Sequence, residues 1–306
     1  MMEKPVTVYK IKHSQFHMDF HRLEDRMERD DFCFYLFVGG DSNETKQLFE
    51  HLRQLKSKKL LVIGIFRFPF RFEGKKRMQT AITQYFHMKN LCDSIIFFHG
   101  DGMLDMIPPG TTVLDAHDIF NSLEEETVRG LEEMICEPGE MNIDAQDIQT
   151  FIKDSKGPLF LHTIEDDSFD EPLKYLISAP YLPNNYSDGK QMILNIGFTR
   201  DVDMDSYRQI NLRLHDMFHK ADLVKLGSYF MNETGKRFKI TILINGIDDP
   251  YPQPKQLKQP PKVSFKSDWL KEKWDRLIEK GIKLDISSFD KDHSIHSFDK
   301  KDNIHS

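Results

Sequence analysis

The segment that decides the fold runs from residue 68 to residue 104 and reads "FPFRFEGKKRMQTAITQYFHMKNLCDSIIFFHGDGML". Apolar side chains recur at helical spacing over residues 75–91, and the apolar run "SIIFFHG" (94–100) follows at the length of a strand. Two similar apolar runs lie upstream, at 32–38 and 60–66. Strands that alternate with helices are typical of a mainly parallel sheet, so the sequence predicts an α/β fold.

The same alternation continues toward the C-terminus. A long helical pattern runs from about Asp115 to Cys136, and strand-like and helix-like stretches then alternate as far as Gly246. The break near Pro138 predicts two lobes that are joined by the long helix.

The composition changes after Gly246. Residues 248–262 are rich in Pro, Lys and Gln and are expected to form an extended linker. A short amphipathic helix is predicted over residues 267–280, and the polar, self-repeating stretch 284–306 is expected to be disordered. The histidines of this tail lack a fixed scaffold, so no metal site is expected.

Composition excludes several classes of function. The chain has 306 residues and a formal net charge of −7 without a long basic run, so nucleic acid and anionic membranes are not expected partners. Cys33, Cys92 and Cys136 are too few and too scattered for a disulfide framework or a zinc site, which indicates a reducing compartment. The apolar runs have the length of strands, so no insertion into a membrane is expected and the predicted location is the cytoplasm.

The motif within residues 68–104 resembles the bacterial division GTPase FtsZ, a relative of tubulin. The family's signature reads Pro-Phe-x-Phe-Glu-Gly-x-x-Arg, and the matching residues are Pro69, Phe70, Phe72, Glu73, Gly74 and Arg77. The likeness continues through residues 113–148 and, more loosely, to residue 247. Several motifs in the family's order are a stronger signal of common descent than one motif alone.

The resemblance implies a tubulin/FtsZ-like two-lobe fold. Residues 1–114 would form a Rossmann-like nucleotide lobe, residues 115–137 the central helix, and residues 138–247 an α/β C-terminal lobe. Residues 248–306 would hold the linker, the short helix and a C-terminal peptide.

The start of the nucleotide lobe departs from the family pattern. Only about thirty residues precede the strand at 32–38, too few for the strand–helix units with which the family's lobe opens. We therefore expect a shortened lobe whose sheet is missing an edge. Residues 19–31 resemble the family's helix just before that strand.

The phosphate loop departs as well. The family has Gly-Gly-Gly-Thr-Gly-Thr-Gly, whereas residues 39–45 read Gly-Gly-Asp-Ser-Asn-Glu-Thr. Gly39 and Gly40 remain as candidate phosphate contacts, but Asp41 and Glu44 would face a polyphosphate. Each like-charge pair at about 4 Å costs roughly 1 kcal/mol in water and ~4 kcal/mol near a protein surface. Asp41 or Ser42 could instead cap the following helix.

The base pocket is also changed. His117, Ser122 and Gly100 stand where the family has a stacking aromatic residue, a base-reading Asp and an Asn. Glu73 and Arg77 match the family's ribose-contacting positions, but they could equally form a helix cap and a surface ion pair. We therefore expect no bound cofactor; GTP would be the ligand if the pocket still functions.

The stretch "EPGEMNIDAQDIQ" (137–149) matches the family's synergy loop through Asn142, Asp144 and Asp147. In the family this loop acts on the nucleotide of the neighbouring subunit, where its acids position the attacking water. The alternative is a capping box, with Asp144 as N-cap and Asp147 reaching back to it. The two interpretations are compatible, because the cap would hold the loop in shape.

These features lead to one main hypothesis and several alternatives. The chain would be a pseudo-GTPase that caps or regulates FtsZ filaments through its synergy-loop face, in the cytoplasm and at the division site. Alternatively it is an active FtsZ-type GTPase, a self-assembling filament without nucleotide, or a remnant without function. A further match to the family's C-terminal peptide implies division proteins as partners, and its residues are Leu284, Asp285, Ile286 and Phe289.

Overall fold

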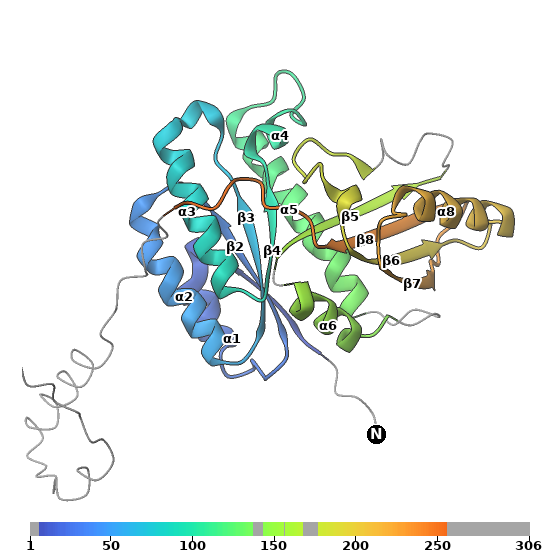
Figure 1. Cartoon of the computed structure of the whole chain (residues 1–306), viewed down its shortest axis with the longest axis horizontal. Coiled ribbons are helices and arrows are strands. Elements are labelled where there is room, and N and C mark those ends of the chain that lie inside the picture. Colours follow the sequence, from blue (N-terminus) through green and yellow to red (C-terminus); the bar gives the residue numbers. More distant parts are fainter. Residues whose placement is uncertain (1–5, 137–142, 156, 168–176, 256–306) are drawn as a thin grey trace, which may run out of the picture. The chain divides into compact units, whose positions relative to one another are not determined.

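The structure is a computed structural model that describes residues 6–136, 143–155, 157–167 and 177–255 (Figure 1). These residues form an eight-stranded sheet with the strand order β1-β2-β3-β4-β5-β8-β6-β7. The strands are β1 (Val8–Lys12), β2 (Phe32–Val38), β3 (Leu61–Arg67), β4 (Ser94–Phe98), β5 (Pro158–Asp166), β6 (Gln191–Phe198), β7 (Leu223–Phe230) and β8 (Phe238–Asn245). The α-helices are α1 (Phe16–Leu23), α2 (Thr45–Ser57), α3 (Lys75–Leu91), α4 (Gly100–Leu104), α5 (Val113–Cys136), α6 (Ala145–Ser155) and α8 (Met204–Met217). The predicted α/β class is confirmed.

Strands β1 to β4 are parallel and form the first half of the sheet. The side chains of β2, β3 and β4 are buried along almost their whole length, as expected for strands that are covered on both faces. Helices pack closely on this half: a Cβ added at Gly64 of β3 would lie 2.6 Å from the Met88 side chain of α3. The apolar runs that predicted these strands are therefore the core of the first half.

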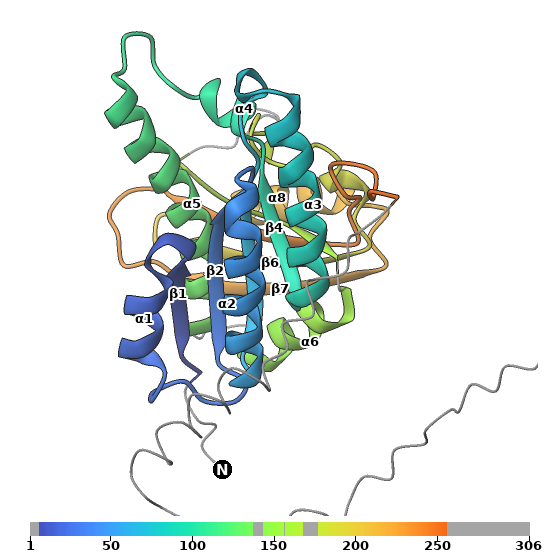
Figure 2. The ribbon, with the colours of Figure 1, turned by 90° about the vertical axis from the view of Figure 1, so that its left-hand side faces the viewer.

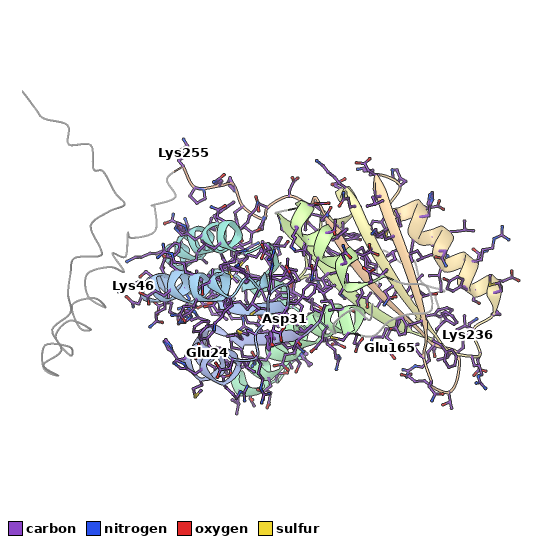
Figure 3. The ribbon with its side chains drawn as sticks, turned by 90° about the horizontal axis from the view of Figure 1, so that it is seen from below. Glu24, Asp31, Lys46, Glu165, Lys236 and Lys255 are labelled. Atoms are coloured by element: carbon purple, nitrogen blue, oxygen red, sulfur yellow. The ribbon has the colours of Figure 1, made fainter. Side chains whose placement is uncertain are left out.

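Strand β1 was not predicted from the sequence. Its side chains alternate: Tyr9 and Ile11 are buried, whereas Lys10 and Lys12 point to the face that α5 covers and form ion pairs with that helix. The carboxylate of Asp31, labelled in Figure 3, accepts hydrogen bonds from the N–H groups of Thr7 (3.1 Å) and Glu28 (3.0 Å). The expectation of a missing edge is corrected in part, because β1 forms the edge of the sheet beside β2 (Figure 2).

The second half of the sheet begins at β5, which joins the two predicted lobes. β5 pairs in parallel with β4 only at Ile95–Pro158 and Ile96–Leu159, and from Phe160 to Asp166 it pairs with antiparallel β8. β8 continues antiparallel to β6, and β6 is parallel to β7. The long helix α5 packs on β5 and β8 so closely that a Cβ at Gly130 would lie 2.1 Å from the Thr163 hydroxyl oxygen. The two lobes are thus halves of one continuous sheet.

The segment after β8 returns to the first half and crosses over β4 toward α3 (Figure 1). The Asp249 carboxylate accepts a hydrogen bond from the Tyr85 hydroxyl at 2.9 Å and pairs with the Lys89 ammonium at 2.6 Å. The Tyr251 ring meets the Phe68 ring edge-on at 5.0 Å. Among the described helices, none is long and apolar enough to cross a membrane. The predicted helix at 267–280 and the tail at 284–306 lie outside the described residues.

The contacts of Asp249 predict a measurable stabilisation. We expect Asp249→Ala to lower the free energy of unfolding by about 1–3 kcal/mol, because it leaves the Tyr85 hydroxyl and the Lys89 ammonium without their acceptor. Asp248→Ala is the matched control, since the neighbouring Asp248 is exposed. Equal denaturation midpoints for the two variants would show that the crossing segment contributes nothing through Asp249.

Candidate functional site

The candidate nucleotide site lies at the carboxyl ends of the parallel strands, where ligands bind in open α/β sheets. The loop after β2 begins with Gly39, whose N–H donates to the carbonyl oxygen of Arg67 at 2.9 Å. A Cβ at Gly39 would lie 2.3 Å from the Phe66 ring, and Gly40 has a φ of 120°, in a region that favours glycine. Both glycines therefore have packing or backbone reasons to be there without a ligand.

Gln84 of α3 holds this loop from inside the protein. Its side chain is fully buried. Its amide oxygen accepts the Gly40 N–H at 2.8 Å, and its amide nitrogen donates to the Asp41 carbonyl oxygen at 2.6 Å and to the Thr45 hydroxyl at 2.9 Å. The Gly40 N–H, which a phosphate would need, is thus already used. Sequence analysis did not identify Gln84, because an isolated glutamine in a helical pattern carries no motif.

Asp41 and Glu44 make the loop acidic. Asp41 accepts the Asn43 N–H at 2.8 Å and so caps the short 3-10 helix Ser42–Glu44. The prediction that Asp41 or Ser42 caps the following helix is corrected, because α2 begins after Glu44 without a side-chain cap. Burial, and then the Asp41 carboxylate, raise the pKa of Glu44, although Arg77 opposes this effect. The environment of the loop therefore disfavours the ionised form of Glu44, next to the Asp41 carboxylate.

Glu73 and Arg77 make the cap and ion pair that were considered as the alternative to ribose contacts. A Glu73 oxygen accepts the Phe70 N–H at 2.9 Å, and the other lies 2.8 Å from Arg77 Nε. The Arg77 side chain lies over Gly40, where a Cβ would be 2.5 Å from its Cγ. A role of Glu73 and Arg77 in binding ribose stays a prediction.

The remaining candidate base contacts have internal roles or are exposed. The Ser122 hydroxyl donates to the Asp118 carbonyl oxygen at 2.9 Å, and His117 is exposed on α5. A Cβ at Gly100 would lie 2.4 Å from the Phe68 carbonyl oxygen, so the asparagine of the family pattern does not fit this backbone. Next to it, Asp101 pairs with Arg71 Nε at 2.8 Å.

A small cavity of about 170 Å³ lies at the ends of β1, β2 and β3 beside α5. Its wall contains the ion pair of Arg67 and Glu124, 3.3 Å apart, in which burial raises the pKa of Glu124. Within the described residues, His13 Nε2 and Arg67 Nη1 are buried without a hydrogen-bond partner. Pockets for drug-sized ligands have about 300–1,000 Å³, so this cavity is too small for a nucleotide in its present shape.

Two histidines and a tyrosine form a chain of hydrogen bonds that begins at His13 in the wall of this cavity. The Tyr35 hydroxyl lies 2.6 Å from His13 Nδ1 and 2.9 Å from His51 Nδ1. The His51 ring also stacks on Phe16 at 3.8 Å. Burial lowers the pKa of His13 to about 4, and burial together with the neighbouring histidines lowers the pKa of His51 to about 3. Both rings are therefore neutral at neutral pH.

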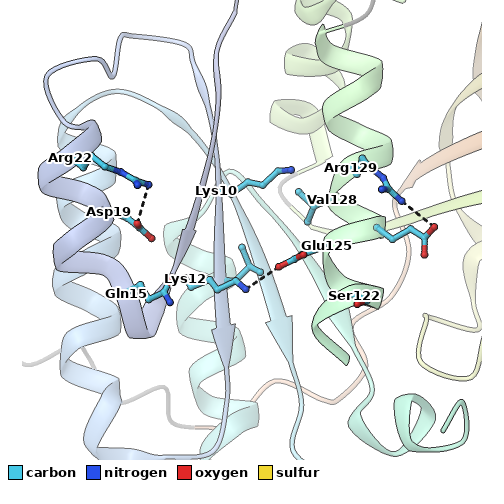
Figure 4. Close-up of a pocket in the computed structure, with 11 residues that line it drawn as sticks. Lys10, Lys12, Gln15, Asp19, Arg22, Ser122, Glu125, Val128 and Arg129 are labelled. Carbon is cyan, nitrogen blue, oxygen red and sulfur yellow. Dashed lines mark hydrogen bonds and ion pairs between the residues drawn. The ribbon is translucent and has the colours of Figure 1, made fainter. Parts of the chain in front are cut away.

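The wider cleft in Figure 4 has a volume of about 560 Å³ and lies between β1, α1 and α5. Its cations are neutralised from within: Arg22 pairs with Asp19 at 3.3 Å and Lys12 with Glu125 at 3.0 Å. Arg129 is likewise 3.3 Å from Glu126. Lys10 also lines the cleft and pairs with Glu132 of α5, so each of the four cations already has a carboxylate partner within the chain.

The predicted synergy-loop residues lie next to α6. Asp144 is exposed and accepts the Asp147 N–H at 2.7 Å, which confirms its role as N-cap. The second half of the predicted capping box is wrong, because the Asp147 carboxylate forms an ion pair with Lys225 of β7 instead. Asn142 lies outside the described residues. Among the residues that the structure describes, no group of three or more potential ligands is arranged to hold a metal ion.

The chain is similar in sequence to FtsZ proteins. It is 29% identical over 196 residues to the cell division protein FtsZ of Buchnera aphidicola subsp. Baizongia pistaciae, covering 62% of this chain and 51% of that protein. It is 22% identical over 211 residues to FtsZ of Aquifex aeolicus, covering 67% of this chain and 57% of that protein. The chain therefore spans about half the length of the curated relatives it matches. No family model matches it.

Solved structures agree at the level of the fold. The empty FtsZ dimer of M. jannaschii superposes with a TM-score of 0.61 at 17% identity, covering 76% of this chain and 69% of that chain. CetZ2 from Haloferax volcanii, solved as a GTPγS-bound protofilament, has a TM-score of 0.60 at 13% identity, covering 88% of this chain and 77% of that chain. The protein thus has the tubulin/FtsZ fold. Taken with the sequence similarity, it is an FtsZ-like protein, as the motif at 69–77 predicted.

The role of Gln84 can be tested by removing its amide. We expect Gln84→Leu to lower the free energy of unfolding by about 1–3 kcal/mol, because the Gly40 N–H and the Asp41 carbonyl lose their partner. The exposed Gln79 lies on the same helix, and Gln79→Leu should change stability little. Hydrogen exchange should also show a faster Gly40 amide only in Gln84→Leu; an unchanged rate there would contradict the assignment.

The neutral histidines predict a pH dependence of stability. Between the ordinary histidine pKa of 6.5 and the folded value of His51 of about 3, the unfolded chain binds a proton that the folded chain does not. The free energy of unfolding should therefore fall as the pH drops below 6.5. Denaturation at several pH values should give a smaller fall for His51→Gln than for the exposed control His215→Gln. Equal slopes for both variants would contradict the prediction.

Proposed function

We propose that this chain is a cytoskeletal protein of the FtsZ type that does not hold GTP in its own loop. Instead, it binds FtsZ filaments through the end of the molecule that carries Asp144 and Asp147. In this function it is a pseudo-GTPase that caps filaments or regulates their assembly in the cytoplasm, at the division site. FtsZ is its main partner.

The observation that carries this proposal is that the loop at residues 39–45 already forms hydrogen bonds within the protein, through Gln84. A phosphate loop needs free N–H groups, and Gln84 already takes the Gly40 N–H. Asp41 and Glu44 belong to this loop, and a carboxylate about 4 Å from a phosphate charge would repel it by roughly 1–4 kcal/mol. This repulsion opposes the hydrogen bonds that a phosphate could still form there, at about 1.5–3 kcal/mol each for a charged acceptor, and the Arg77 guanidinium beside Gly40 offsets part of it.

The end with α6 supports the second part of the proposal. The Asp144 carboxylate is exposed, and its contact with the Asp147 N–H fixes it at the start of α6. The Asp147 carboxylate is engaged by the Lys225 ammonium within the chain, whereas the Asp144 carboxylate is exposed. Of the two acids, Asp144 is therefore better suited to polarise a water molecule on a partner's nucleotide, with Asp147 and Asn142 as supporting residues.

Proteins with this fold have been solved as assemblies. FtsZ of M. jannaschii has been solved as a dimer, and CetZ2 from Haloferax volcanii as a GTPγS-bound protofilament. In a mixed filament this chain would supply the Asp144 end and would offer no nucleotide for the next subunit. The peptide with Leu284, Asp285, Ile286 and Phe289, outside the described residues, would add contacts to division proteins.

Co-sedimentation with FtsZ and GTP tests the proposal. The wild-type chain should sediment with FtsZ filaments and lower their GTP turnover. We expect Asp144→Ala/Asp147→Ala to weaken binding by about tenfold or more, equivalent to ~1.4 kcal/mol, because it removes the acids of the docking end.

Asp154→Ala/Asp201→Ala is the control with the same change of charge, since both residues are exposed. It should bind like the wild type. A wild-type chain that stays in the supernatant and leaves GTP turnover unchanged at equimolar amounts would refute the proposal.

A further inference from the structure

The outer strand of the second half, β7, exposes apolar side chains. It is the last strand of the sheet, and on one side it pairs with β6 along all eight residues. Among the described residues no strand pairs with its other side. The exposed fractions are 43% for Leu223, 44% for Val224, 36% for Leu226 and 39% for Phe230. Long apolar edge strands of this kind are templates for pairing with another chain.

The two faces of β7 differ. Lys225 and Gly227 face α6 and the segment before it, where Lys225 pairs with Asp147 and Gly227 lies against Ile143. Because side chains alternate along a strand, Val224, Leu226 and Phe230 share the opposite face. Phe230 lies opposite Phe198 in the ladder, and Phe198 contacts Tyr207 of α8. The exposed apolar stripe is therefore on the α8 face of the sheet.

This edge lacks the usual protection against pairing. The sequence of β7, "LVKLGSYF", contains no proline and only one charged residue. That residue, Lys225, is neutralised by Asp147 on the α6 face. Soluble proteins commonly protect such edges with unpaired lysines, prolines or bulges.

We propose that β7 pairs with β7 of a second copy of this chain, antiparallel, about a two-fold axis near Gly227. Val224 of each copy then lies opposite Phe230 of the other, and Leu226 opposite Ser228. Lys225 meets Tyr229, so no like charges face each other across the axis. The strand is self-complementary under this symmetry, which a two-fold interface requires and which favours a second copy over an unrelated partner.

The pairing is independent of the nucleotide loop and of Asp144. It joins the sheets of two molecules side by side and leaves the α6 end of each molecule available. Because a single strand pair buries less surface than a standard interface, we expect a weak dimer with a Kd in the micromolar range. Failure of FtsZ binding and failure of this pairing are separate outcomes.

Sedimentation velocity tests the pairing. The wild-type chain should show a concentration-dependent dimer, and Leu226→Lys should weaken it by at least about tenfold, because two lysines would enter the joined stripe. Leu212→Lys on α8 is the matched control, since Leu212 is an apolar residue that is 48% exposed outside β7. It should leave the dimer unchanged. A wild-type chain that is monomeric at all concentrations, or that pairs only after FtsZ is added, would overturn the proposal.

Disulfide cross-linking tests the register without relying on a disruptive variant. In a Cys136→Ser background, the double variant Val224→Cys/Phe230→Cys should give a covalent dimer on oxidation. Within one chain these positions are too far apart along the strand to bond, at about 3.3 Å per residue. Each single variant should remain largely monomeric. Equal cross-linking of the single and double variants would contradict the two-fold register, and no cross-linking of the double variant would contradict the pairing itself.

Discussion

The pairing of β5 with two different neighbours is the constraint on which the rest of the structure depends. β5 pairs in parallel with β4 at its first two residues and antiparallel with β8 from Phe160 to Asp166, so a parallel half and a mixed half become one sheet. Helix α5 packs on β5 and β8, and Gly130 permits the close approach. Consequently, the loop at the carboxyl ends of β1 to β3 and the Asp144 cap of α6 have fixed places in one molecule.

The chemistry of the loop after β2 follows from a residue that lies deep in the fold. Gln84 uses both ends of its amide on residues 40–45, and Arg77 covers Gly40. Opening this loop for a phosphate would leave a buried amide without partners, at a cost of about 1–3 kcal/mol, in addition to the repulsion from Asp41 and Glu44. At the α6 end, in contrast, the Asp144 carboxylate is exposed. This difference between the two sites underlies the proposal of a subunit that contributes to a neighbour's site and lacks its own.

Much of this could be predicted from the sequence, and the failures have physical reasons. Continuous apolar runs gave β2, β3 and β4, because strands that are buried on both faces leave an unambiguous pattern. β1 was missed because "VYKIK" has lysines on the face toward α5, where ion pairs replace apolar packing. Asp144 was recognised as a cap because capping is local, whereas Asp41, one of two candidates, caps a 3-10 turn before α2 and not α2 itself. Gln84 lies 44 positions from its partner Gly40, and Lys225 lies 78 positions from its partner Asp147. No local sequence pattern carries information about contacts over such separations.

The central claim is that the protein cannot hold a nucleotide in its own loop. It is tested most directly by calorimetric titration of the purified chain with GTP and Mg²⁺, with FtsZ as the positive control. The proposed function predicts no saturable heat for this chain up to about 1 mM GTP, which corresponds to a binding free energy weaker than about −4.1 kcal/mol. Saturable binding near 1 µM, or about −8.2 kcal/mol, would contradict the account and would show that the loop opens around the phosphates.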